Sequence, residues 1–192
     1  MQKTTSWILI LVLASSLLGL AAVAVTPASG QTDTPVVIVL TADGPISPAM
    51  AEYLARGIEV AERRGAEALI FQINTPGGAV TTMNAMVQDI LASQVPVIVY
   101  VAPRGGMAAS AGTIITLAGH AAAMAPETMI GAASPVGSEG EDLGETMAAK
   151  EENALAATVR ALAERRGLEA VAFAEATIRQ ASAASANEAL EI

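Results

Sequence analysis

The chain has 192 residues, of which 53% are hydrophobic and 3% aromatic, so its core must be aliphatic and is large enough to need no disulfides. The net charge is −9, with 10 basic and 19 acidic residues, which excludes the clustered Lys and Arg of a nucleic-acid-binding protein. With no Cys and a single His, thiolate and histidine-based metal sites are excluded, and we expect no metal and no other cofactor.

The first 30 residues predict an export segment. Lys3 provides a short positive start, and residues 7–25 are apolar apart from two serines. Residues 26–30 then supply a helix break and the small residues that a signal peptidase accepts. Because the apolar stretch is close to the ~20 residues of a membrane-spanning helix, residues 1–30 are either a cleaved signal peptide or an N-terminal anchor. In both cases we expect residues 31–192 to form one domain outside the cytoplasm.

From residue 32 onward the pattern predicts strands that alternate with helices. The predicted strands are residues 36–40, 68–73, 95–101, 121–125 and 128–131, and the predicted helices are residues 48–64, 80–93, 146–165 and 170–180, with a small-residue helix that begins at Ser110. Such alternation predicts an α/β fold with a mainly parallel sheet and right-handed crossover helices. The short aliphatic runs further suggest central strands that are covered on both faces.

Two loops that each follow a predicted strand are candidates for chemistry, because loops at the carboxyl edge of a parallel sheet line the ligand crevice. In the first loop, residues 74–78, the bare amides of Gly77 and Gly78 can form an oxyanion hole, although the loop is equally an ordinary Pro-Gly-Gly turn. The second loop delivers Ser110 to the start of a helix, with the amide of Ala111 as a further donor. Ser110 is equally explained as a helix N-cap.

Four motifs in this order resemble the NfeD family of ClpP-class membrane-associated serine proteases, which are encoded beside stomatin-like proteins. The motifs are N-T-P-G-G at residues 74–78, V-P-V-I-V-Y-V-A-P at 95–103, A-A-S-A-G-T at 108–113 and A-M-A-P-x-T-x-I-G-A at 123–132. The resemblance covers about residues 36–190. It implies a ClpP/crotonase-like fold and a serine endopeptidase with a Ser-Lys dyad, which cleaves apolar segments such as the C-terminal region of a stomatin-like partner.

The resemblance also implies the roles of individual residues. It places the nucleophile at Ser110 and oxyanion donors at Gly77 and Gly78. The family's lysine lies at the start of the helix after a Gly-rich loop, where Lys150 is the only candidate. The alternative is a surface lysine that pairs with Glu145.

A lysine base must be neutral to accept a proton, and a free lysine amine has a pKa near ~10.4. Burial in an apolar cleft favours the neutral form. Glu151 and Glu152 would hold the Lys150 amine charged, but on a helix both acids can face solvent. The single histidine, His120, lies at the far end of the short helix that starts at Ser110, so we do not expect it to be the base.

Other expectations concern the whole protein. Residues 188–190 match a late E-A-L element after which the family continues with a strand and membrane helices, so we expect the protease domain to be truncated and its membrane region to be missing. We also expect membrane association of the full-length protein and a homodimer or larger homo-oligomer. The main alternative is a non-catalytic scaffold that binds a stomatin-like membrane protein. A crotonase-type acyl-CoA enzyme is disfavoured, because no basic pocket for CoA phosphates is visible.

Overall fold

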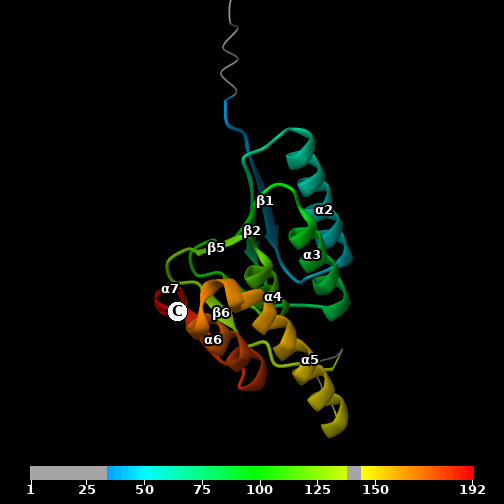
Figure 1. Ribbon diagram of the computed structural model, residues 1–192, viewed down its shortest axis with the longest axis vertical. Helices are drawn as coiled ribbons and strands as arrows, with labels where there is room; N and C mark the ends of the chain where they lie inside the picture. The colour runs from blue at the N-terminus through cyan, green and yellow to red at the C-terminus, as the bar shows by residue number, and fades with distance from the viewer. Residues whose placement is uncertain (1–33, 138–143) are drawn as a thin grey trace, which may run out of the picture. The chain divides into compact units, whose positions relative to one another are not determined.

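The computed structural model describes residues 34–137 and 144–192, which form one compact unit from Pro35 onward (Figure 1). The predicted export segment, residues 1–30, lies outside the described residues. No helix within the described ranges has both the length and the apolar character that are needed to cross a bilayer.

Two sheets organise the described residues. The main sheet has four parallel strands in the order β1 (Val37–Asp43), β2 (Ala68–Asn74), β3 (Val97–Val101) and β5 (Ala121–Met124). The small sheet contains β4 (Met107–Ala109), β6 (Met129–Gly131) and β7 (Ala183–Ser185), in which β4 and β6 are parallel and β7 is antiparallel to β6. The prediction of a mainly parallel α/β fold is confirmed.

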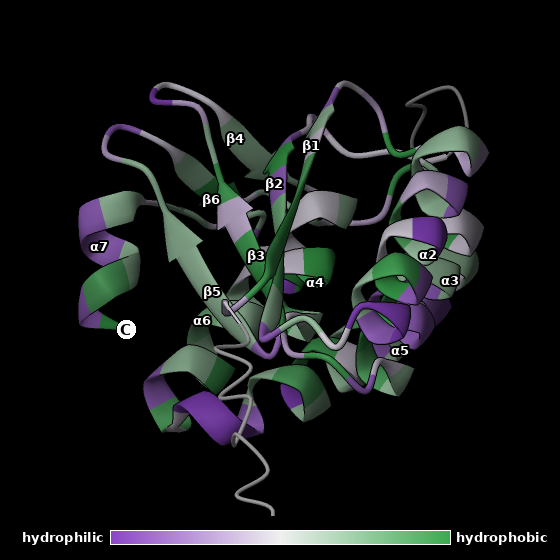
Figure 2. Ribbon diagram, turned by 90° about the horizontal axis from the view of Figure 1, so that it is seen from above, coloured by the Kyte–Doolittle hydropathy of each residue, from purple (hydrophilic) through white to green (hydrophobic). Residues whose placement is uncertain are grey.

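The helices lie between the strands along the chain, except the last one, which follows β7 and contacts the small sheet. They are α2 (Pro48–Arg63), α3 (Val80–Ala92), α4 (Ala111–Ala118), α5 (Glu145–Ala163), a short 3₁₀ turn η1 (Glu164–Arg166), α6 (Leu168–Arg179) and α7 (Ala186–Glu191). Helices α2 and α3 lie side by side along the sheet in both views (Figures 1 and 2). The start of α2 agrees with its prediction, because the Met50 amide donates to the Ser47 hydroxyl at 3.4 Å and Pro48 occupies the first turn.

The main core lies between the main sheet and the helices. Alternate residues of β2, Leu69, Phe71 and Ile73, are each 0% exposed, and a fully buried side chain of this size contributes roughly 2–3 kcal/mol. A smaller apolar cluster joins the two sheets and consists of Val101, Ala108, Ile130 and Ala184. Hydrophobic colouring follows the strands, whereas α2 and α5 carry hydrophilic patches (Figure 2).

The expectation that the central strands are covered on both faces is met only in part, because β2 and β3 alternate buried with half-buried residues, and it does not extend to the edge strand β1. Val37 and Val39 are 46% and 57% exposed, and every second residue of β1 faces outward. The physical reason is that β1 packs one face against α2 and has no comparable helix contact on its other face among the described residues. A continuous aliphatic run therefore marks a strand here without marking burial on both sides.

Three short elements, β4, β7 and α7, were not predicted. The first two have only three residues each, which is too short for a periodic pattern to be visible. They form because β6 offers hydrogen-bonding edges to both of them. The strand β4 leads directly into Ser110 and therefore belongs to the candidate site.

Candidate active site

Ser110 lies on a sharp turn between β4 and α4. Its backbone has φ 53° and ψ −119°, a conformation that is costly for a residue with a side chain and that persists only where the surroundings enforce it. The Ser110 amide donates to the Gly131 carbonyl at 3.0 Å, and the Ser110 carbonyl accepts from the Thr113 amide at 2.9 Å. Although Ser110 occupies the N-cap position, its hydroxyl makes no capping hydrogen bond. The N-cap explanation therefore does not account for this serine.

Thr113, in the first turn of α4, holds the turn at Ser110 in place. Its side chain is fully buried, and its hydroxyl oxygen accepts from the Gly131 amide at 3.0 Å. The same oxygen lies 2.9 Å from the Ala108 carbonyl and 3.0 Å from the Gly131 carbonyl, and its one proton can be donated to only one of them at a time. Thr113 thus ties β4, β6 and α4 together around Ser110. The A-A-S-A-G-T motif contained this threonine, but its role was not predicted.

The 74–78 loop runs alongside β4 and so reaches Ser110. The Thr75 amide donates to the Met107 carbonyl at 2.8 Å, and the Ala109 amide donates to the Thr75 carbonyl at 3.0 Å. The Asn74 side-chain oxygen also accepts from the Met107 amide at 2.9 Å. These bonds place the two predicted loops side by side at the carboxyl edge of the main sheet, where parallel-sheet topology predicts them to meet.

Gly77 and Gly78 each occupy a position that only glycine fits. Their φ angles are +117° and +157°. A Cβ atom on Gly77 would lie 2.6 Å from the Cβ of Ser110, and one on Gly78 would lie 2.4 Å from the Ile46 carbonyl oxygen. The lack of a side chain at Gly77 therefore lets the loop backbone approach the serine closely.

The amides of the three predicted oxyanion donors differ in their availability. The Gly77 amide donates to the Thr75 hydroxyl at 3.1 Å, so it is already occupied. The amides of Gly78 and Ala111 have no hydrogen-bond acceptor among the residues that the structure describes. Gly78 and Ala111 are therefore the donors that this geometry leaves free for a substrate oxygen.

A cavity of about 710 Å³ opens beside Ser110, within the size range of small-ligand and peptide side-chain sites. Its described lining comes from the 74–78 loop and α3, the turn at Ser110 and α4, the segment after β6, and α5: Pro76, Gly78, Ala79, Val80, Thr81, Met83, Ser110, Ala111, Ile114, Ala133, Ser134, Pro135, Val136, Gly137, Met147, Glu151 and Leu155. Most of these residues are apolar or glycine. The cavity is thus suited to an apolar peptide segment.

Lys150 lies outside this lining. It is exposed on α5 and lines a separate, shallower hollow of about 370 Å³ with the first residues of that helix. The residues of α5 that face the cavity are Met147, Glu151 and Leu155, which are spaced four residues apart on one helix face. The structure therefore brings Ser110 and the glycine loop together and leaves Lys150 on the neighbouring face of α5.

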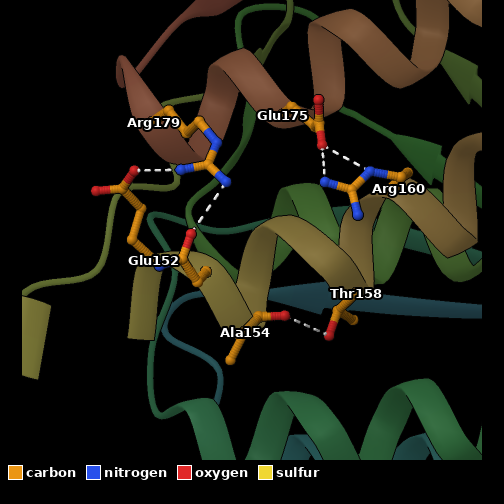
Figure 3. Close-up of polar contacts among 7 residues, drawn as sticks. Glu152, Ala154, Thr158, Arg160, Glu175 and Arg179 are labelled. Atoms are coloured by element: carbon orange, nitrogen blue, oxygen red, sulfur yellow. Dashed lines mark hydrogen bonds and ion pairs between the residues drawn. The ribbon is translucent and has the colours of Figure 1, made fainter. Parts of the chain in front are cut away.

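Contacts with α6 set the rotation of α5 (Figure 3). The Arg179 guanidinium donates to the Glu152 carboxylate at 2.9 Å and to the Asn153 side-chain oxygen at 3.1 Å. Further along, Arg160 of α5 pairs with Glu175 of α6. Glu152 therefore faces α6, away from the cavity. The expectation that both acids can face solvent is wrong, because Glu152 is half-buried against Arg179 and Glu151 is half-buried where it lines the cavity.

His120 lies at the end of α4 opposite Ser110, as its spacing predicts. Its Nδ1 accepts from the Val97 amide at 3.1 Å, and its own amide donates to the Val97 carbonyl at 2.8 Å. The residue thus links the end of α4 to the start of β3. Arg104, another residue near the serine in sequence, forms an exposed ion pair with Glu127, which lowers the pKa of that carboxyl group. Neither residue takes part in the site.

Comparisons with known proteins agree with this arrangement. The family model described as the N-terminal domain of NfeD1b matches residues 36–191. The membrane-bound protease PH1510 of Pyrococcus horikoshii is 46% identical over 101 residues, which are 53% of this chain and 23% of that protein, so the matched part spans about a quarter of the relative's length.

Solved structures show the same fold. Two mutant structures of the 1510-N membrane-bound stomatin-specific protease, a serine-to-alanine mutant and a lysine-to-alanine mutant in complex with a substrate peptide, each have a TM-score of 0.74 and 36% identity. They cover 82% of this chain and 76% and 72% of their own chains. ClpP1 from Listeria monocytogenes has a TM-score of 0.61 at 20% identity, over 81% of this chain and 85% of its own. The described domain therefore has a ClpP-like fold.

Proposed function

The chain belongs to the NfeD1b family, whose N-terminal domain model matches residues 36–191, and from this premise we propose that it is a serine endopeptidase with Ser110 as nucleophile. The observation that carries the proposal is the strained strand–turn–helix at Ser110, because a serine at φ 53° with an uncapped hydroxyl on a substrate-sized cavity has no structural role to explain it. The ClpP-like fold of the domain is consistent with peptide hydrolysis.

In the proposed reaction the Ser110 hydroxyl oxygen attacks the carbonyl carbon of a peptide bond. The negative charge that develops on the carbonyl oxygen is stabilised by the amides of Gly78 and Ala111, the two donors left free. The peptide nitrogen leaves with a proton, and an ester forms between Ser110 and the acyl half of the substrate. Water then hydrolyses this ester and restores the serine.

We assign the proton transfer to Lys150. Lys150 lines the neighbouring hollow, and Met147, three residues earlier on the helix, lines both that hollow and the cavity. The assignment requires the amine to reach the serine hydroxyl in the complex with substrate, and catalytic hydrogen bonds often form only in such a complex.

The substrate that we propose is an apolar segment of a membrane-associated protein such as a stomatin-like partner. The support is the apolar lining of the cavity, together with the resemblance to proteases that are described as membrane-bound and stomatin-specific. The same resemblance supports membrane association of the whole protein. An extracytoplasmic location and a homodimeric or larger assembly remain predictions.

The test is hydrolysis of apolar peptides by the wild-type chain and three variants. We expect Ser110→Ala to lower the rate at least about a thousandfold and Lys150→Ala about a hundredfold or more. Ser93→Ala is the matched control, because Ser93 lies at the end of α3 and bonds only locally to Val95 among the described residues. A lysine base further predicts a rate that rises toward alkaline pH.

Two outcomes would contradict the proposal. Equal hydrolysis by the wild-type chain and both site variants would show that the dyad is wrongly assigned. Binding of the same peptides with no hydrolysis by the wild-type chain would instead favour the non-catalytic scaffold.

A further inference from the structure

The cavity beside Ser110 contains one feature that an apolar substrate does not explain. Among the described lining residues, Glu151 is the only one with a charged side chain. The surrounding residues of α5, Met147 and Leu155, are apolar. Glu151 is half-buried, and partial burial of a carboxylate costs free energy unless a partner compensates for it.

Glu151 has no such partner within the described ranges. No Lys or Arg nitrogen there lies within 4.0 Å of its carboxylate. The next residue along the helix, Glu152, does have one, because Arg179 binds it from α6 (Figure 3). The two adjacent acids therefore differ in their surroundings. Glu151 faces the cavity without a cation, whereas Glu152 is paired with Arg179 on the side of α5 that faces α6.

The pairing of Glu152 also keeps Glu151 in place. Arg179 binds both Glu152 and Asn153, and Arg160 binds Glu175 two turns further along. These contacts fix the rotation of α5 against α6 from two points. Because neighbouring residues on a helix differ by about 100° in direction, this rotation places Glu151 on the face of α5 that lines the cavity.

The charge also opposes the proposed reaction. The oxygen held by Gly78 and Ala111 becomes negative during attack by Ser110, and a carboxylate that lines the same cavity repels that charge. A positive side chain on the substrate would neutralise Glu151 and remove the repulsion. The preference for such a substrate should therefore be larger for hydrolysis than for binding.

We propose that Glu151 is a specificity-determining residue that binds a Lys or Arg side chain of the substrate next to the scissile bond. The inference rests on the proposed peptidase function, and it narrows the substrate to an apolar segment that carries one basic residue near the cleavage point. It assigns Glu151 a binding role and no step in the chemistry.

The test uses apolar peptides that are identical except that norleucine is replaced by Lys at successive positions. Binding is measured to the Ser110→Ala chain, so that no peptide is consumed. We expect Lys at one position to strengthen binding about tenfold. Adding Glu151→Gln should reduce this preference to less than about twofold. Adding Glu169→Gln, which removes the same charge at an exposed position in the first turn of α6, should leave the preference in place.

Hydrolysis by the chain with Ser110 intact is then compared for the favoured Lys peptide and its norleucine counterpart. We expect Glu151→Gln to slow cleavage of the Lys peptide and to speed cleavage of the norleucine peptide, a crossover that partial unfolding cannot produce. A Lys preference that is absent at every position, that survives Glu151→Gln, or that disappears equally with Glu169→Gln would overturn the inference. If the Lys preference in binding depends on Glu151 but no peptide is cleaved, the peptidase proposal is overturned and the binding role of Glu151 stands.

Discussion

At the scale of single residues, the site depends on backbone positions that few side chains can occupy. Ser110 has a strained φ of 53°, and Gly77 and Gly78 have positive φ angles in the loop beside it. These conformations are stable because buried hydrogen bonds from Thr113 and Thr75 enforce them. The residues that hold the nucleophile are thus distinct from the residues proposed to react.

The close approach of Gly77 to Ser110 predicts the effect of a single methyl group. In Gly77→Ala the new Cβ would lie 2.6 Å from the Ser110 Cβ, so the serine turn must move. We expect peptide hydrolysis to fall about a hundredfold or more in protein that is still folded, because displacements near 1 Å have effects of that size.

Gly167→Ala is the matched control for that variant. Gly167 has a similar φ of +105°, but a Cβ there meets nothing within 4 Å. The control should lose stability from backbone strain and keep its activity per folded molecule. Equal losses of activity in the two variants, normalised to the folded fraction by circular dichroism, would contradict the proposed contact.

The buried hydroxyl of Thr113 predicts a cost in stability. Thr113→Val keeps the shape of the side chain but leaves the Gly131 amide without its acceptor. We expect the free energy of unfolding, from urea titration, to fall by about 1–3 kcal/mol. Thr158→Val removes an exposed hydroxyl that bonds to Ala154 within α5 (Figure 3) and should change stability by no more than about 0.5 kcal/mol. Similar values for the two variants would show that Thr113 does not tie the strands together.

At the scale of secondary-structure elements, α4 matters most for the site, because Ser110 lies at its N-terminal end. The carbonyl groups at its C-terminal end need hydrogen-bond donors from outside the helix. The last carbonyl groups of α4 accept from two adjacent guanidinium groups, those of Arg165 and Arg166. Burial and the positive charge of Arg165 lower the pKa of Arg166, and the helix dipole favours cations at this end. The arginine pair therefore stabilises the helix that presents the nucleophile.

This capping predicts the effect of removing one guanidinium. Arg166→Met keeps the aliphatic stem but removes the bonds to the Leu117 carbonyl at 2.7 Å and the Gly119 carbonyl at 3.0 Å. We expect a loss of about 2 kcal/mol in the free energy of unfolding. Arg64→Met is the control, since Arg64 is exposed at the end of α2, and it should cost no more than about 0.5 kcal/mol. If Arg166→Met also costs no more than about 0.5 kcal/mol, the hydrogen bonds from Arg166 to the end of α4 do not contribute measurably to stability.

At the scale of the whole molecule, local patterns predicted most of the fold. Aliphatic runs located the strands of the main sheet, and turn and cap residues such as Ser47 and Pro48 located the helices, because these signals depend on neighbours in sequence. Parallel-sheet topology then predicted that the 74–78 loop and the loop before Ser110 meet at one edge.

The features that sequence could not predict all depend on contacts between distant residues. The three-residue strand β4 exists only because β6 pairs with it. The exposed position of Lys150 and the cavity-facing position of Glu151 follow from the rotation of α5, which Arg179 sets from α6. A spacing of four residues places Met147, Glu151 and Leu155 on one helix face, but spacing alone does not say which way that face points.

The most direct test of the central claim is a crystal structure of the domain with a peptide boronate, which forms a tetrahedral adduct with a catalytic serine. The account predicts a covalent bond from boron to the Ser110 hydroxyl oxygen. It also predicts a boronate oxygen within about 2.7–3.1 Å of the Gly78 and Ala111 amides and the Lys150 amine within hydrogen-bond distance of the serine. A boronate bound to any other residue, or a Ser110 adduct whose oxygen meets neither amide, would contradict the account.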